Sequence, residues 1–212
     1  MELDLDILAD ALGRVIDARE AELRLEQAVY GLDALDELPL QAIVAEGLAS
    51  SWAVEREVHY PSTFGRKLTH RPRCDLVLAP TGFPLRLDRE PPSLFEPQNF
   101  TKPEDAFWLE VKRAAQFKMP DVRHKGYGNQ WRQAVVKDLQ KMEADPLIRH
   151  AALLLIVFTE SEAVVEKDLQ LFEDVLAQKE VLAGFRQVRH VPIVDRIGHK
   201  LATVAAWPTL AR

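Results

Sequence analysis

The longest uninterrupted apolar run of the chain, Ala151–Phe158, limits most narrowly what this sequence can fold into. Eight apolar residues are too few to cross a bilayer, which takes about 20. Continuous apolarity over this length is instead typical of a strand that is covered on both faces. The run therefore predicts a buried central strand over 150–159, and no membrane span.

The segments around this run change between two hydrophobic periods. Helical spacing over Leu3–Tyr30 predicts one long helix, or two helices joined near Gly13. The same spacing predicts three more helices, which cover Glu37 or Pro39 to Ser51, Gln130–Glu143, and Ser161–Lys179.

Strand-like segments lie between and after these helices. Apolar and polar residues alternate over Val54–Tyr60, as in a half-buried strand. Further strands are predicted over Arg73–Leu78, Phe107–Lys112, Phe185–Val194 and Lys200–Trp207. Residues 83–105 contain five prolines, which predicts a long irregular excursion of the chain between two of these strands. A strand meander followed by a helical crossover into a buried strand indicates an α/β fold with a mixed sheet flanked by helices.

Length and composition indicate one domain with a core of its own. The chain has 212 residues, of which 47% are hydrophobic, and we expect a helical extension over residues 1–36 followed by the domain over residues 37–212.

The acidic start predicts a cytoplasmic protein. Cys74 is the single cysteine, so an internal disulfide and a Cys-based zinc site are excluded. The six histidines show no short metal-ligand spacing, which disfavours a zinc hydrolase.

Charge is unevenly distributed along the chain. Residues 1–57 contain four basic and fourteen acidic residues, whereas residues 58–150 contain sixteen basic and eleven acidic residues. Phosphate attraction depends on local charge, so the middle of the chain could bind nucleic acid although the net charge is −6. The alternative is an ordinary solvated surface.

Three residues on two predicted strands carry a chemical pattern. Glu110 and Lys112 project from one face of their strand, and Asp75 on a neighbouring strand can reach that face. Two carboxylates form a hard oxygen site suited to Mg²⁺ or Mn²⁺, and a lysine beside them can orient an attacking water. Both acids interrupt apolar runs, where a buried charge needs compensation. The alternative is a surface strand with a Glu–Lys ion pair.

These residues resemble the PD-(D/E)xK nuclease superfamily, which has the restriction-endonuclease-like fold, over about residues 37–160. The matching pieces are an acid-bearing helix, the three strands, and a later helix with Lys137-Asp138-Leu139, in the order αβββαβ. Two features depart from the family pattern. Cys74 stands where the family name has proline, and 35 positions separate Asp75 from Glu110.

The resemblance implies a metal-dependent nuclease that hydrolyses phosphodiester bonds, with DNA as the favoured candidate substrate, in restriction, repair or phage defence. By the same resemblance, Asp75, Glu110 and the main-chain carbonyl of Val111 would hold Mg²⁺ or Mn²⁺, and Lys112 would assist the attacking water. Family members often add an acid from the first helix, which here is either Glu37 or Glu46.

Basic residues cluster where such a nuclease would contact DNA. The candidates are Arg66, Lys67, Arg71, Arg73, Lys118, Lys125 and Lys137. Paired cuts in duplex DNA would need two active sites, so a homodimer is expected, with the N-terminal helix as the candidate interface. The alternative function is a non-cleaving, nuclease-like module that binds nucleic acid or a partner protein.

Overall fold

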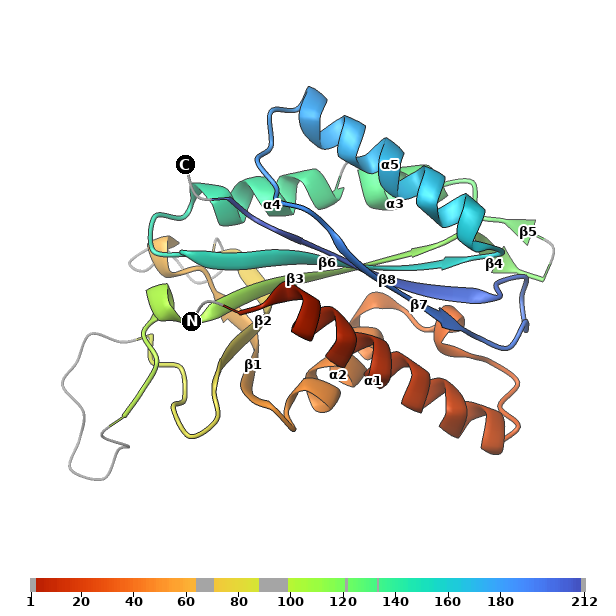
Figure 1. Cartoon of the computed structure of the whole chain (residues 1–212), viewed down its shortest axis with the longest axis horizontal. Coiled ribbons are helices and arrows are strands. Elements are labelled where there is room, and N and C mark those ends of the chain that lie inside the picture. The colour runs from red at the N-terminus through yellow and green to blue at the C-terminus, as the bar shows by residue number, and fades with distance from the viewer. Residues whose placement is uncertain (1–2, 64–70, 88–98, 121, 133, 211–212) are drawn as a thin grey trace.

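A mixed six-stranded sheet in the order β1-β2-β3-β6-β8-β7 forms the middle layer of the molecule (Figure 1). The computed structural model describes residues 3–63, 71–87, 99–120, 122–132 and 134–210. The strands are β1 (Trp52–His59), β2 (Arg73–Pro80), β3 (Phe107–Ala115), β6 (His150–Thr159), β7 (Gln187–Pro192) and β8 (Leu201–Pro208). Strands β3 and β6 run parallel, and the other neighbours run antiparallel. The predicted mixed α/β sheet is confirmed.

Helices cover both faces of the sheet (Figure 1). Helices α1 (Leu5–Leu25) and α2 (Glu37–Leu48) pack on one face. Helices α3 (Tyr127–Arg132), α4 (Ala134–Ala144) and α5 (Glu162–Gln178) pack on the other. Short 3-10 helices, η1 (Leu32–Ala34), η2 (Pro61–Thr63) and η4 (Pro103–Asp105), lie in the connections.

Strand β6 lies within the sheet and is buried on both faces, as its apolar run predicts. Leu153 and Leu155 point into the core under α3, α4 and α5, whereas Leu154 and Ile156 point into the core under α1 and α2. A strand that serves two cores has no face left for polar side chains.

Helix α1 belongs to the same core as the sheet. Leu8, Leu12 and Ile16 are fully buried and pack in one cluster with Leu109 of β3. The helix is continuous, and Gly13 within it allows the close approach of Arg189, because a Cβ at Gly13 would lie 3.3 Å from the Cβ of Arg189. The predicted extension over residues 1–36 and the domain after it therefore share one hydrophobic core.

Several segments differ from the sequence-based expectations. The predicted helix over 130–143 starts earlier and is described as α3 and α4, with residue 133 outside the described residues. A small hairpin, β4 (Phe117–Met119) with β5 (Val122–Arg123), was not predicted, because its strands are too short to show a period. In the proline-rich excursion Leu85 forms a parallel bridge with Thr101, and residues 88–98 lie outside the described residues. No helix in the described parts of the chain is long and apolar enough to span a membrane.

Candidate active site

Asp75 lies where strands β2 and β3 part. The ladder between them joins Leu76–Leu78 to Phe107–Leu109. Asp75 lies one residue beyond the end of this ladder. There the Val111 amide donates a hydrogen bond of 2.8 Å to the side-chain oxygen Asp75 Oδ2 instead of to a backbone carbonyl of β2. The side chain of Asp75 is only 13% exposed. The opening between the two strands therefore holds a carboxylate whose position is fixed by main chain.

Glu110 brings a second carboxylate to this opening from β3. Its side chain is 3% exposed, and the Tyr60 hydroxyl donates a hydrogen bond of 2.6 Å to its Oε1. Tyr60 itself is buried and stacks on Trp108. Burial, together with the negative charge of Asp75, raises the pKa of Glu110 to about 8, although Lys112 and the Tyr60 hydrogen bond act in the opposite direction.

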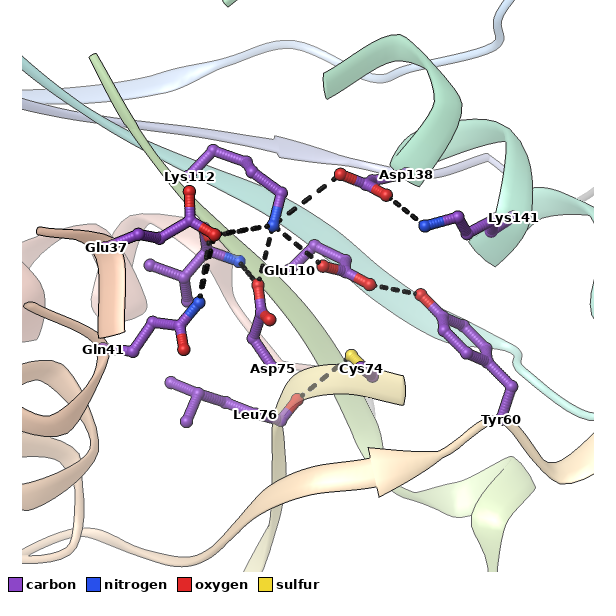
Figure 2. A network of polar contacts seen from close by, with 11 residues as sticks. Glu37, Gln41, Tyr60, Cys74, Asp75, Leu76, Glu110, Lys112, Asp138 and Lys141 are labelled. Carbon is purple, nitrogen blue, oxygen red and sulfur yellow. Dashed lines mark hydrogen bonds and ion pairs between the residues drawn. The ribbon is translucent and has the colours of Figure 1, made fainter. Parts of the chain in front are cut away.

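Lys112 places its ammonium among the oxygens of this site (Figure 2). Its Nζ lies 3.1 Å from Asp75 Oδ2, 3.2 Å from the Val111 carbonyl oxygen, 3.3 Å from Glu37 Oε1 and 3.4 Å from Glu110 Oε2. Burial alone would lower the pKa of Lys112, but the surrounding carboxylates, Asp75 foremost, raise it well above its usual range. The oxygens therefore form a cage that stabilises a cation.

Helix α2 contributes two side chains from its first turns. Glu37 and Gln41 are four residues apart and share one helix face. Gln41 is buried, and its Nε2 donates to the Val111 carbonyl at 3.4 Å and to Glu37 Oε1 at 3.5 Å. Glu46 lies elsewhere, in a groove between α1 and α2 that Arg19 also lines. Of the two acids predicted for this helix, the structure therefore brings Glu37, and not Glu46, to Lys112.

Helix α4 adds a further acid from the opposite side of the sheet. Asp138 Oδ2 lies 3.7 Å from Lys112 Nζ, and Asp138 Oδ1 accepts a hydrogen bond from Lys141 (Figure 2). Sequence reasoning did not assign a role to Tyr60, Gln41 or Asp138. The spacing of Gln41 from Glu37 was a usable signal, whereas the contacts of Tyr60 and Asp138 depend on packing between distant segments.

The predicted nucleic-acid-binding residues are dispersed over several elements. Lys118 on β4, Lys125 after β5 and Lys137 on α4 are exposed. Arg73 at the start of β2 is exposed, and its Nη1 lies 3.7 Å from Glu57 Oε2. Arg71 is partly exposed. Arg66 and Lys67 lie outside the described residues.

The donor set around Lys112 is the one that hard divalent cations prefer. It consists of carboxylate oxygens and one main-chain carbonyl, and the protein's own ammonium shows that the cage accepts positive charge. Within the described ranges, no group of three or more His, Cys, Asp or Glu side chains is arranged so that it could hold a metal ion. No protein-family model matches the chain, and no curated protein or solved structure matches it either.

Proposed function

We propose that this protein is a metal-dependent nuclease that hydrolyses phosphodiester bonds in DNA. One observation carries the proposal: the Lys112 ammonium lies within 3.4 Å of oxygens from Asp75, Glu110, Glu37 and the Val111 main chain. Two of these carboxylates are largely buried, and a protein seldom buries several acids around one lysine unless they perform a function.

The arrangement of the elements supports a restriction-endonuclease-like core. Helix α2 precedes the meander β1-β2-β3, and helices α3 and α4 lead into β6, which lies parallel to β3. Asp75 comes from the second strand of this series, and Glu110 and Lys112 come from the third. This is the order that the resemblance to the PD-(D/E)xK superfamily implies.

In this proposal Asp75, Glu110 and the Val111 carbonyl hold Mg²⁺ or Mn²⁺, and Glu37 adds an acid at the rim of the site. The ion supplies Lewis-acid activation of the phosphate and lowers the pKa of a bound water. Gln41 orients the Val111 carbonyl, and Tyr60 orients the Glu110 carboxylate. Lys112 keeps its proton and orients the attacking water beside the phosphate.

Charge on the surface supports an anionic polymer as substrate. Lys118, Lys125 and Lys137 are exposed, and they come from segments that follow β3 in the chain. Such contacts bind phosphates without reading sequence. We therefore expect binding that weakens steeply as the salt concentration rises.

Cleavage assays with matched variants test this function. The purified protein, with Mg²⁺ or Mn²⁺, should cut plasmid or linear DNA, and EDTA should stop the reaction. Asp75→Asn, Glu110→Gln and Lys112→Met should each reduce the rate by about 10²- to 10⁴-fold. Asp174→Asn is the control, because Asp174 is exposed on α5 and should leave the rate unchanged.

Two outcomes would contradict the proposal. A variant at Asp75 or Lys112 that cuts DNA at the wild-type rate would exclude these residues from catalysis. Salt-sensitive DNA binding without cleavage and without Mn²⁺ binding would instead favour the non-cleaving, nuclease-like module. RNA substrates belong in the same assay, because cleavage of RNA alone would change the substrate class.

A further inference from the structure

Lys112 has acidic partners from both helical layers of the molecule. The Val111 carbonyl lies 3.2 Å from its ammonium. Asp75, Glu110 and Glu37 also approach the ammonium, and Asp138 approaches it from helix α4 (Figure 2). We propose that Asp138 is a positioning residue, which holds the Lys112 ammonium beside the site when Asp75 and Glu110 bind a divalent ion. This inference rests on the proposed function.

The first argument concerns competition between like charges. The Lys112 ammonium now contacts the same oxygens that the proposed function assigns to the metal ion. Lys112 cannot keep all these contacts when a divalent ion is bound there, because two cations in one partly buried site repel each other strongly. The Lys112 side chain is only 14% exposed, so its ammonium needs another acidic partner if it is to stay in the site.

The second argument concerns the place and fixation of Asp138. Its side chain is 11% exposed, and Lys141 binds its Oδ1, so that Oδ2 is left for Lys112. Helix α4 is held in the core by Val135 and Leu139, which are fully buried. The distance of 3.7 Å from Asp138 Oδ2 to Lys112 Nζ is longer than a hydrogen bond. A shift of Lys112 towards α4 would therefore shorten a contact that is now weak.

Lysine-ammonium NMR gives a readout that does not depend on activity. Ammonium protons that are held by acceptors exchange slowly enough to be seen, and the Lys112 signal is identified by its loss in Lys112→Met. In the wild type the signal should shift on addition of Mg²⁺ and persist. In Asp138→Asn it should be visible without Mg²⁺, because the other carboxylates hold it, and should disappear with Mg²⁺. Asp174→Asn should behave as wild type.

Calorimetry with Mn²⁺ separates this inference from the proposed function. Asp138→Asn should bind Mn²⁺ within about twofold of wild type, whereas Asp75→Asn should lose binding. Cleavage by Asp138→Asn should show a kcat lowered by about 10- to 100-fold with little change in KM, because Lys112 acts on the attacking water. Asp138→Glu, which keeps the charge, should recover part of this loss.

Each adverse result has a distinct meaning. A Lys112 signal that persists with Mg²⁺ in Asp138→Asn, or that vanishes with Mg²⁺ in the wild type, would overturn the role of Asp138. Loss of Mn²⁺ binding in Asp138→Asn would overturn it as well, because Asp138 would then be a ligand. Wild-type protein that binds no Mn²⁺, or binding that survives in Asp75→Asn, would instead refute the proposed metal site, and this inference with it.

Discussion

The Tyr60 hydroxyl donates a hydrogen bond of 2.6 Å to Oε1 of Glu110, and Oε2 of the same carboxylate lies 3.4 Å from the Lys112 ammonium. Tyr60 thus fixes which oxygen of Glu110 faces the site. Because Tyr60 follows β1 and Glu110 lies on β3, a contact between segments 50 residues apart sets the geometry of the carboxylate.

Tyr60→Phe should lower the free energy of unfolding by about 1–3 kcal/mol, since it leaves a buried carboxylate oxygen without its donor. Urea denaturation followed by circular dichroism measures the loss. Tyr127→Phe is the matched control, because Tyr127 also donates to an acid, Asp168, at 2.7 Å. Both variants should lose stability, but only Tyr60→Phe should reduce cleavage. An equal effect of both variants on cleavage would contradict a local role for Tyr60.

The stability of the metal-free protein should fall as pH rises from about 5 to 8. Glu110 has a pKa of about 8 in the folded state, against an ordinary value of 4.5. Between these two pKa values the folded state therefore binds more protons than the unfolded state. In this pH range the free energy of unfolding falls by up to about 1.4 kcal/mol for each pH unit.

Urea denaturation in EDTA at several pH values checks this slope. Glu110→Gln should flatten it, because the amide does not titrate. Glu55→Gln, at an exposed position of β1, should keep the wild-type slope. A slope that is unchanged in Glu110→Gln would assign the pH dependence to other groups.

Glu57→Gly should stabilise the protein. Glu57 lies within β1 with φ of 55°, a left-handed conformation that costs a residue with a side chain about 1–2 kcal/mol. Glycine removes this strain but adds entropy to the unfolded chain, so we expect a gain of up to about 1 kcal/mol. Glu55→Gly in the same strand should destabilise, since Glu55 is outside the left-handed region. Thermal melting measures both effects, and a lower Tm in both Glu57→Gly and Glu55→Gly would contradict the strain at Glu57.

The ion pair between Glu20 and Arg196 should anchor α1 to the rest of the fold. Glu20 Oε1 accepts from Arg196 Nη1 at 2.9 Å and from the Val194 amide at 3.0 Å, and the two side chains are 2% and 7% exposed. Glu20→Ala should cost about 3–5 kcal/mol, because it leaves a buried guanidinium unpaired.

A double-mutant cycle tests this pair. Combining Glu20→Ala with Arg196→Met should cost less than the sum of the single changes, since the double variant contains no unpaired charge. Additive losses would show that the two residues act independently. Arg19→Met is a surface control, because its partners Glu22 and Glu26 are exposed and its loss should cost less than about 1 kcal/mol.

Local sequence was sufficient for most of the secondary structure. The continuous apolarity of Ala151–Phe158 identified β6, and helical spacing identified α1, α2 and α5, because periodicity follows directly from which faces are buried. The spacing of Glu110 and Lys112 also placed them on one face of β3. The hairpin β4–β5 left no such pattern, since two or three residues do not make a period.

The site itself required tertiary structure. Sequence alone named Asp75, Glu110 and Lys112, and left Glu37 and Glu46 equivalent. The choice of Glu37 follows from the way helix α2 packs against the sheet. The first turn of α2, with Glu37, faces Lys112, whereas Glu46, later in the same helix, faces the groove beside α1. Tyr60 and Asp138 reach the site only because β1 pairs with β2, the strand next to β3, and because α4 packs against β3. Strand and helix periods are local, whereas the contacts that give a carboxylate its position and its pKa are made between distant segments.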